Sequence, residues 1–273
     1  METAIDGLPV RLREPHDLGF LARWGRVFRV FDDQDSGNLC FGVESASCGR
    51  VFVKYAGAEP LRYQGSPSEA RDRLRHAAEV YRALAHPTLV QLVETLETDA
   101  GSALVFEWSD SVSLGRQYGA REALAGLSVG TRARAVQEIY DFHAHAASRG
   151  WVAVDLYDGS VLIDPSTGRV TICDVDFYQP APFINTTGRM WGSERFMSPE
   201  EHEKGALIDE VTNLVALGSL AHTLLGDDDT KSRDAWRGTD DQFAIAERAR
   251  RPLRQDRCDS VSTLAKEWAA TVH

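Results

Sequence analysis

The stretch SRGWVAVDLYDGSVLIDPSTGRVTICDVDFY, residues 148–178, decides the fold of the second half of this chain. Two apolar runs, 160–163 and 170–172, flank a polar turn at 164–168 that contains Asp, Pro, Ser and Gly. This pattern predicts a β-hairpin. Asp174 follows the second predicted strand almost at once, where the chain leaves the hairpin. The stretch therefore predicts a carboxylate presented just beyond a strand end.

The sequences that flank this hairpin predict a helix on one side and an irregular stretch followed by helices on the other. Upstream, the Ala-rich run 131–148 predicts a long helix that ends at Gly150. Downstream, an irregular stretch reaches about residue 200, and helical text continues to the end. The second half, 110–273, is therefore expected to be mainly helical.

The first half is rich in predicted strands. The apolar, Val- and Phe-rich runs expected to form strands are 25–31, 39–45, 50–56, 89–98 and 102–108. Residues 67–86 show helical spacing, with Ser68 as a candidate N-cap and Pro87 as the stop. We therefore expect a five-stranded antiparallel sheet with one helix over 1–109. Strands first and helices second indicate an α+β architecture rather than alternating βαβ units.

Composition narrows the class of protein. The 273 residues are 43% hydrophobic and carry a formal net charge of −11. Such a charge argues against nucleic acid or an anionic membrane as a partner, and no run is apolar enough to span a bilayer. The cysteines show no metal-ligand spacing: Cys40, Cys48, Cys173 and Cys258. Scattered thiols and the absence of signal-peptide text indicate a soluble, cytoplasmic protein of unpredicted oligomeric state.

Six segments, in this order, resemble motifs of eukaryotic-type protein kinases. They are RVFVK (50–54), AHPTLVQL (85–92), ALVFEW (103–108), SRGWVAVDLYDGSVLI (148–163), ICDVDFY (172–178) and GSERFMSPE (192–200). The chain is also similar to bacterial kinase-like proteins that carry QDSGN, DxYDG and GRMWGSxRFMSPEE. The resemblance implies a bilobed, protein-kinase-like fold that binds ATP and Mg²⁺, with 1–109 as the nucleotide-binding lobe and 110–273 as the catalytic lobe.

Three residues would carry the chemistry that the resemblance implies. Asp155 matches the catalytic-loop aspartate that orients the acceptor hydroxyl, Asp174 the magnesium ligand, and Lys54 the strand lysine that reaches the α- and β-phosphates. Each has a simpler alternative. Asp155 could cap a turn, Asp174 could be a solvated strand-end aspartate, and Lys54 an exposed strand lysine.

The nucleotide site implied by the resemblance includes further residues. Phe106 matches the gatekeeper, Glu107 and Trp108 would lie beside the adenine, and Leu162 is assigned to the same pocket. Gly37 matches the third glycine of the phosphate-binding loop. Asp32 and Gln34 stand where its other glycines are expected, so a polar hairpin without phosphate contact is an equal alternative.

The helix before the fourth strand and the adenine pocket also depart from the pattern. Ala77 occupies the position of the helix C glutamate, and Glu79 is the nearest acid, about 200° around the helix. Glu79 could pair with Lys54 after a local shift or lie on a solvated face. Phe52 replaces a small residue that packs on adenine.

Further departures lie in the catalytic loop. Ala153 and Val154 replace His and Arg, which implies activity independent of activation-loop phosphorylation. Ser160 stands where an asparagine metal ligand is expected and has a shorter side chain. Asp158 or Asp176 could then compensate as a second metal ligand. The sequence Asp-Val-Asp is closer to the metal motif of aminoglycoside kinases.

Other matches are structural. The resemblance implies an ion pair between Glu200 and Arg257, and Asn213 replaces an aspartate of helix F. His143 and His145 are expected to be packed or solvated rather than metal ligands.

Three functions are compatible with these residues. The first is a divergent serine/threonine protein kinase, because GSERFMSPE resembles a peptide-docking segment. The second is a small-molecule kinase that phosphorylates a hydroxyl on an antibiotic or metabolite. The third is a nucleotide-binding pseudokinase or scaffold.

Overall fold

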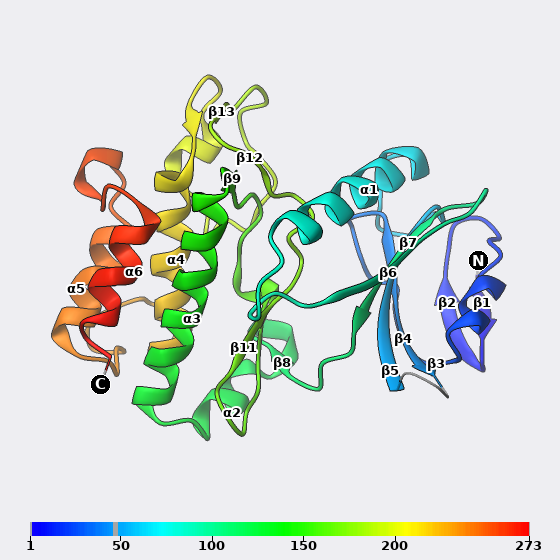
Figure 1. Cartoon of the computed structure of the whole chain (residues 1–273), viewed down its shortest axis with the longest axis horizontal. Coiled ribbons are helices and arrows are strands. Elements are labelled where there is room, and N and C mark those ends of the chain that lie inside the picture. Colours follow the sequence, from blue (N-terminus) through cyan, green and yellow to red (C-terminus); the bar gives the residue numbers. More distant parts are fainter. Residues whose placement is uncertain (1, 46–48, 273) are drawn as a thin grey trace. The chain divides into compact units, whose positions relative to one another are not determined.

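The computed structural model describes residues 2–45 and 49–272. Cys48 lies outside the described residues. The α+β class is confirmed: the chain combines helices with several small antiparallel sheets (Figure 1). It divides into two compact units, Met1–Ala85 with Val90–Ser109, and His86–Leu89 with Asp110–His273. None of the helices in the described ranges has the length and apolar character needed to cross a bilayer.

The first unit is built on a five-stranded antiparallel sheet in the order β3-β4-β5-β7-β6. Its strands are β3 (Arg26–Phe31), β4 (Asn38–Ser45), β5 (Gly49–Ala56), β6 (Leu92–Glu97) and β7 (Ser102–Glu107). Each lies in a run that the sequence predicts as a strand. Residues 86–89, which we expected in this half, instead pack with the second unit, where Thr88 accepts a hydrogen bond from the Ile172 amide.

The single helix of this sheet layer, α1 (Pro67–Ala83), packs on β5, β6 and β7. Its N-cap is Ser66, and the expectation of Ser68 was wrong. The Ser66 hydroxyl accepts from the Glu69 amide while the Glu69 carboxylate accepts from the Ser66 amide. Pro67 takes the first helical position, where its missing N–H costs nothing. The N-cap therefore lies two residues before the expected Ser68.

The other face of the sheet is covered by the first 24 residues, whose structure the sequence patterns did not indicate. This segment contains a hairpin, β1 (Glu2–Ile5) with β2 (Leu8–Arg11), and a 3₁₀ turn, η1 (Gly19–Arg23). Its apolar side chains join the inward-facing residues of β4 and β5 in one core: Val10, Leu12, Leu18 and Leu21 with Leu39, Phe41, Val43 and Val53. The sheet is therefore covered on both faces.

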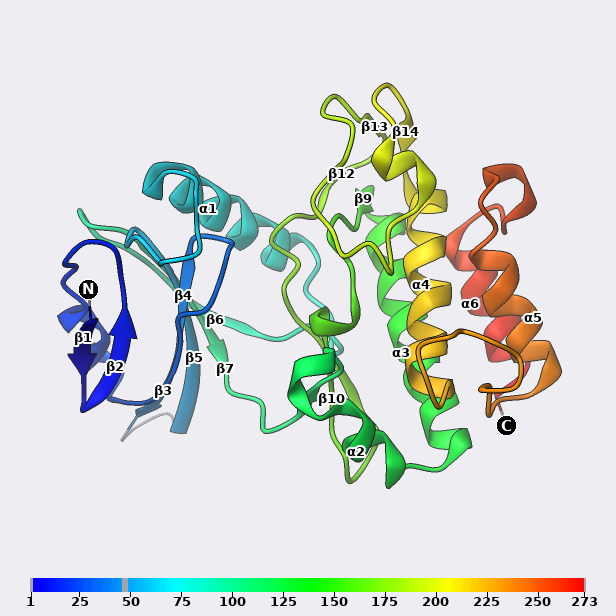
Figure 2. The same ribbon diagram turned by 180° about the vertical axis from the view of Figure 1, so that it is seen from behind.

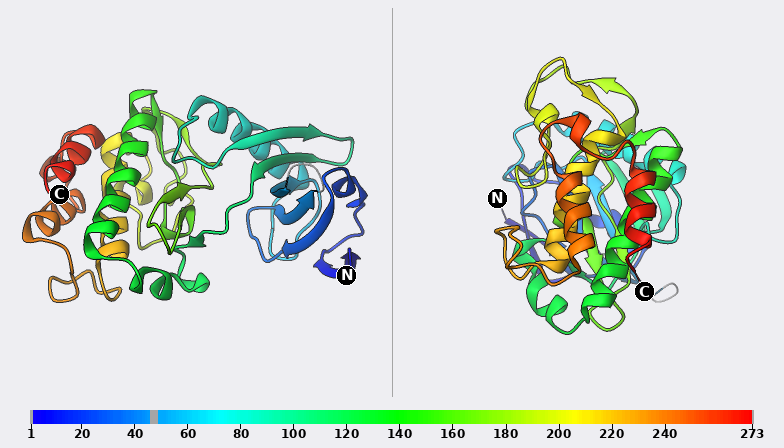
Figure 3. Two further views of the ribbon diagram at one scale, coloured as in Figure 1. Left: turned by 60° about the horizontal axis from the view of Figure 1, so that its bottom comes forward. Right: turned by 90° about the vertical axis from the view of Figure 1, so that its left-hand side faces the viewer.

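The second unit is mainly helical. Its helices are α2 (Ala120–Ala125), α3 (Val129–Ser148), α4 (Glu210–Leu225), α5 (Asp240–Ala249) and α6 (Val261–Ala269). The long α3 packs against both α4 and α6, and α5 lies beside α6 (Figure 3). Trp268 fixes one of these contacts, because its fully buried indole donates to the Ala133 carbonyl at 2.9 Å.

Short strands position the loops of this unit (Figure 2). They are β8 (Val112–Ser113), β9 (Trp151–Val152), β10 (Val161–Ile163), β11 (Val170–Ile172), β12 (Gln179–Pro180), β13 (Phe183–Ile184) and β14 (Leu207–Ile208). The predicted hairpin is present as β10 and β11, and β8 extends it to three strands. β12 pairs with β9, and β14 with β13.

Candidate functional site

Two short antiparallel pairings in the second unit bring the segments of Asp155 and Asp174 together. Val152 of β9 pairs with Gln179 of β12, so the chain running on to Asp155 lies beside the chain coming from Asp174. On the other side, the Cys173 amide donates to the Ser160 carbonyl at 2.8 Å, directly beyond the β10–β11 ladder. Residues far apart in the sequence thus meet at the ends of these strands.

Asp155 and Asp174 share an unusual backbone conformation. Both have φ of +61°, in the left-handed region that residues other than glycine rarely occupy. Each such residue costs of order 1 kcal/mol and persists where the surroundings dictate it. Both side chains are partly exposed. The strand pairings on either side supply that constraint and hold two carboxylates at the surface of the unit.

The hydroxyl of Tyr178 lies within the electrostatic influence of both carboxylates. Burial raises the pKa of this phenol well above its usual value, and the charges of Asp174 and Asp155 raise the pKa further. Both carboxylates therefore lie within electrostatic range of the same atom. A bound cation near these two segments would be stabilised by both carboxylates.

A buried histidine holds Tyr178 in place. His143 on α3 has Nδ1 2.7 Å from the Ile139 carbonyl and Nε2 2.8 Å from the Tyr178 hydroxyl. A carbonyl can only accept, so Nδ1 carries the proton and Nε2 accepts from the hydroxyl. Burial lowers the pKa of His143 to about 4, which keeps the ring neutral. The expectation that His143 is a packed residue agrees with its 3% exposure.

The other predicted metal ligands lie in the same region. Ser160 ends the 3₁₀ turn η3 (Asp158–Ser160) and is 1% exposed, and its Oγ has no hydrogen-bond partner among the described residues. Asp176 follows Asp174 by two residues and is also buried. A buried hydroxyl without a partner is the kind of atom that a bound ligand would satisfy. Oxygen donors of this set fit Mg²⁺.

The protein donors alone do not form a complete metal cage. No group of three or more His, Cys, Asp or Glu side chains in the described ranges is arranged to hold a metal. Magnesium commonly takes one or two carboxylates and completes its octahedron with water and substrate phosphates. A Mg²⁺ ion held at Asp174 would therefore need further ligands from water or from a bound molecule.

Asp158, considered as a compensating metal ligand, is engaged elsewhere. Its side chain is 3% exposed and accepts from the Arg195 guanidinium at 2.7 Å. Arg195 also lies over the Phe196 ring, and Lys231 donates to the Arg195 carbonyl at 2.7 Å. The ion pair ties η3 to the segment 192–200, so the structure gives Asp158 a positioning role rather than an open coordination site.

Two hydrogen bonds from Asn213 hold the loop that precedes Asp155. The amide of Asn213, on α4, accepts from the Ala153 amide at 2.8 Å and donates to the Ala153 carbonyl at 2.6 Å. Asn213 is 6% exposed. An asparagine can satisfy both a donor and an acceptor at once, which an aspartate cannot. The residue predicted as a scaffold substitution therefore fixes the backbone two residues from Asp155.

Leu162 takes the middle of β10, where it pairs with Thr171 on one side and Ser113 on the other. Its side chain is partly exposed. It belongs to the same small sheet that carries Ser160 and Asp174 at its end.

Lys54 lies in the first unit, on β5, with Cys40 and Leu104 as its cross-strand partners. The residue is 8% exposed, which excludes the alternative of an exposed strand lysine. Because strand residues two apart share a face, Phe52 lies on the same side of the sheet. A lysine rarely lies this deep without an anionic partner or ligand.

The remaining candidates of the first unit form an aromatic group on that sheet. Phe106 is buried on β7 and its ring contacts that of Tyr81 on α1, with centroids 4.7 Å apart. Trp108 is partly exposed and packs edge-on against Phe28 at 4.9 Å. Glu107, between them, is exposed. Phe52 lies 6.4 Å from Phe106 and 6.5 Å from Trp108, so it fills the space beside both rings.

The QDSGN turn is held by packing. Gly37 has φ of +84°, and a Cβ there would lie 2.8 Å from Ala70 on α1 and 2.8 Å from the Tyr63 ring. Arg73 of α1 donates to the Ser36 carbonyl. The need for glycine at this position thus has a structural cause: the turn closes tightly against the helix.

The acidic residue before this turn is neutralised. Asp32 accepts from the Arg11 amide at 2.7 Å and from its guanidinium at 2.7 Å. Burial opposes ionisation, but the bonds to Arg11 prevail and the pKa of Asp32 is lowered. The hairpin that the sequence patterns missed therefore removes much of the repulsion that a free aspartate would exert on a phosphate.

Glu79 lies on the solvent side of α1, as its simpler alternative proposed. The residue is exposed, whereas Ala77 at the expected glutamate position is fully buried against the sheet. The helical rotation of about 200° between the two positions accounts for the difference.

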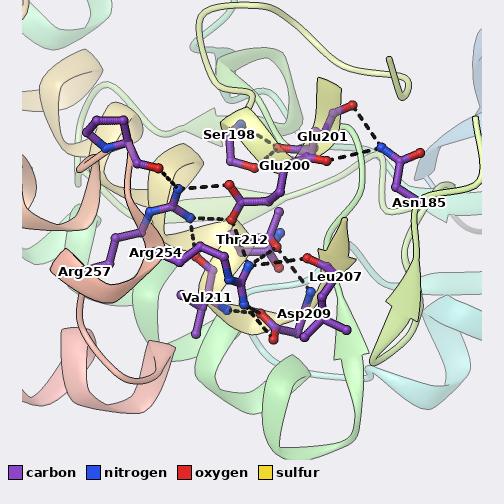
Figure 4. A network of polar contacts seen from close by, with 12 residues as sticks. Asn185, Ser198, Glu200, Glu201, Leu207, Asp209, Val211, Thr212, Arg254 and Arg257 are labelled. Carbon is purple, nitrogen blue, oxygen red and sulfur yellow. Dashed lines mark hydrogen bonds and ion pairs between the residues drawn. The ribbon is translucent and has the colours of Figure 1, made fainter. Parts of the chain in front are cut away.

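A polar network stabilises the end of the 192–200 segment (Figure 4). Glu200 and Arg257 form the expected ion pair, with two bonds of 2.6 and 3.0 Å, and the Arg257 side chain is fully buried. Arg254, which the sequence did not single out, also contacts Glu200 at 2.8 Å and binds both oxygens of Asp209. The Asn185 amide donates to the carbonyls of Glu200 and Glu201.

Comparison with known proteins supports a distant relationship to kinases. No protein-family model matches the chain. The chain is similar to the probable serine/threonine-protein kinase pknA2 of Bifidobacterium longum (strain NCC 2705), with 28% identity over 156 residues. The alignment covers 56% of this chain and 20% of that protein, so the matched part spans a fifth of the relative's length. The similarity suggests a kinase-like relationship.

Three residues of the site were missed by sequence reasoning. Tyr178 and Arg195 lie inside quoted motifs but at positions without an assigned role, and His143 was treated only as packing. The signal available was weak: a histidine on the buried face of a predicted helix and a tyrosine four residues after Asp174. Their contact depends on how α3 packs against β9 and β11, which periodicity does not reveal.

Proposed function

We propose that this chain is an ATP- and Mg²⁺-dependent phosphotransferase with a protein-kinase-like fold, and that it phosphorylates serine or threonine hydroxyls of proteins. The observation that carries the proposal is that the β9–β12 pairing and the Cys173–Ser160 hydrogen bond bring together the segments that hold Asp155 and Asp174, both in the left-handed backbone conformation. Two carboxylates in one place can serve two purposes: one orients an acceptor hydroxyl and the other holds a metal over a phosphate. The distant similarity to a kinase agrees with this assignment.

In this proposal the roles follow from burial and position. Asp155 accepts or orients the proton of the acceptor hydroxyl. Asp174 holds Mg²⁺, with Ser160 and Asp176 as the further oxygen donors of the second unit. When bound, the metal supplies charge neutralisation at the transferring phosphoryl group. The His143–Tyr178 hydrogen bond keeps the segment of Asp174 in register.

The first unit would supply nucleotide-binding groups. Lys54 offers a buried ammonium for phosphate oxygens, and the partly exposed rings of Phe52 and Trp108 offer a stacking surface for adenine. Phe106 would close the base side of this surface, with Glu107 as a further contact within the first unit. Gly37 shapes the neighbouring turn, and we assign it no direct contact with phosphate.

A transfer assay with matched variants tests this proposal. Purified protein with Mg²⁺ and γ-labelled ATP should label itself or a generic protein substrate. Asp155→Asn and Asp174→Asn should each lower the rate by about 100-fold or more, in line with the loss of a positioned base or metal ligand. Asp141→Asn, on the exposed face of α3, is the control and should leave the rate within about twofold.

Two results would contradict the assignment. Label transfer that persists in Asp155→Asn would exclude Asp155 as the group that handles the proton. Transfer that is unchanged in both variants and in excess EDTA would exclude the metal-dependent reaction.

A nucleotide-binding pseudokinase is the second candidate, favoured by the exposure of Glu79. In that case α1 supplies no carboxylate at the position where active kinases of the family carry one. Thermal stabilisation by Mg-ATP without any label transfer would select this function. Transfer to a small-molecule hydroxyl, with no labelling of protein, would select the third possibility, a small-molecule kinase.

A further inference from the structure

A cavity of about 470 Å³ lies within the second unit, and neither Asp155 nor Asp174 lines it. Its walls come from α2, the first turn of α3 and the loop that follows α4 (Figure 2). Asp158 forms part of the lining, and through its ion pair with Arg195 it connects the cavity to the segment 192–200. A volume of this size fits a small ligand or one or two side chains of a peptide.

Three of the acidic residues that line the cavity, Asp227, Asp228 and Asp229, already have partners. Asp229 pairs with Arg116 at 2.9 Å and with Arg121 at 3.5 Å. Asp227 pairs with Arg237, and Asp228 accepts from the amide and hydroxyl of Thr230. These carboxylates therefore have little unsatisfied capacity to attract a cationic ligand.

Arg132 differs from the other arginines of the lining. It lies in the first turn of α3, and its side chain is partly buried. Among the residues that the structure describes, its guanidinium forms one hydrogen bond, from Nε to the Leu127 carbonyl at 3.2 Å, and no ion pair. Burial lowers the pKa of Arg132, which shows that its surroundings disfavour the charge it must carry. Among the described residues the NH1 and NH2 groups of this planar fork form no hydrogen bond, although the charge of Asp227 acts on the guanidinium from a distance.

A planar fork of this kind recognises carboxylates, because its paired N–H groups match two carboxylate oxygens. We propose that the cavity binds the carboxylate of an acidic side chain on a peptide partner, and that Arg132 is the residue that recognises it. The ion pair between Asp158 and Arg195 places the cavity next to the 192–200 segment. The inference rests on the proposed function only in identifying that peptide as the phosphate acceptor.

Charge makes the inference sharply testable. The chain carries a formal net charge of −11, so an acidic peptide gains nothing from non-specific attraction to its surface. Binding of such a peptide would therefore report a specific cationic site.

The experiment compares two fluorescently labelled peptides of the same sequence, one with glutamate and one with glutamine at every acidic position. Fluorescence anisotropy without ATP should show tighter binding of the glutamate peptide. Arg132→Gln should weaken that binding about tenfold or more, because it removes a charge-assisted hydrogen bond. Arg134→Gln, an exposed arginine on the same helix, should change it by less than about twofold.

The Arg132→Lys variant and a phosphoserine peptide test whether the guanidinium recognises a carboxylate rather than any anion. Arg132→Lys keeps the charge without the fork, so it should bind more tightly than Arg132→Gln and less tightly than the native chain. Equal binding of the two peptides, equal losses in Arg132→Gln and Arg134→Gln, or tighter binding of a phosphoserine peptide than of the glutamate peptide would each overturn the inference.

The outcome is separable from that of the proposed function. Glutamate-dependent binding without phosphate transfer would support the proposed carboxylate site and contradict the proposed kinase activity. If the glutamine peptide is phosphorylated at the same rate as the glutamate peptide and binds with the same affinity, the kinase activity is supported and the preference for acidic peptides is contradicted.

Discussion

The Nε2 atom of His143 lies 2.8 Å from the hydroxyl oxygen of Tyr178, and both side chains are buried. This hydrogen bond joins the long helix α3 to the segment that carries Asp174. It joins residues that are 35 positions apart in the sequence. The packing of α3 is therefore coupled to the position of the segment that carries Asp174.

Replacing Tyr178 by Phe should destabilise the second unit by about 1–3 kcal/mol, because Nε2 of His143 is left buried without a donor. Urea unfolding followed by circular dichroism measures this change. Tyr118→Phe, at an exposed tyrosine, is the matched control and should fall within about 0.5 kcal/mol of the native chain. A loss at Tyr178 no larger than the control would show that the hydrogen bond contributes no net stability.

Because His143 is buried in its neutral form, we expect the free energy of unfolding to fall as the pH is lowered. Burial lowers its pKa in the folded state to about 4, from an ordinary value of 6.5. Its contribution is complete above pH 6.5 and is lost as the pH falls towards 4, at about 1.4 kcal/mol per pH unit within that window. His143→Gln, which cannot titrate, should therefore show a flatter stability profile between about pH 7.5 and pH 5. Parallel profiles for the two proteins would contradict this prediction.

Glu201 predicts the opposite pH dependence. It is 7% exposed, and burial raises its pKa to about 7 from 4.5, although the Ser198 amide and hydroxyl both donate to it. Its favourable contribution is present below pH 4.5 and is lost as the pH rises through 7, where a buried carboxyl must ionise.

Glu201→Gln stays neutral at every pH and keeps an oxygen that accepts from Ser198. The variant should gain stability relative to the native chain as the pH is raised from about 5 to 8, by about 1–2 kcal/mol. Thermal melting at several pH values measures the difference. Glu203→Gln, at an exposed glutamate two residues away, should show no such trend.

Arg257 predicts a large loss from one substitution. Arg257→Ala would leave Glu200 buried without the guanidinium that binds both of its oxygens, at a cost of about 3–5 kcal/mol. Arg254 also contacts Glu200 and is expected to limit the loss to the lower part of that range. The exposed pair of Arg233 with Asp240 is the comparison, and Arg233→Ala should cost about 1 kcal/mol or less. Similar losses in both variants would argue against the importance of burial here.

Local patterns predicted the regular elements well. The five strands of the sheet, α1, α3 and the β10–β11 hairpin all occur where alternation, helical spacing and turn residues indicated. Elements of two residues, such as β9 and β12, went unpredicted because so short a strand has no period of its own. The N-cap at Ser66 was missed because Ser68 was preferred, although a proline at the first helical position places the cap at the residue before it.

Predictions about the site divide in the same way. The resemblance identified Asp155, Asp174 and Ser160 as candidates, and the hairpin placed Asp174 just beyond a strand end. It could not show that Asp158 is taken up by Arg195, or that Asp32 is neutralised by Arg11. Both ion pairs join segments more than 20 residues apart, and one-dimensional patterns hold no information about which distant charges meet.

The amino-acid sequence by itself determined which segments become strands and helices, because apolar period and capping chemistry act over a few residues. Only the tertiary structure decided which polar groups meet in the interior. His143 with Tyr178, Asn213 with Ala153 and Arg257 with Glu200 form because burial strips these groups of water and forces each to find a partner within the folded unit.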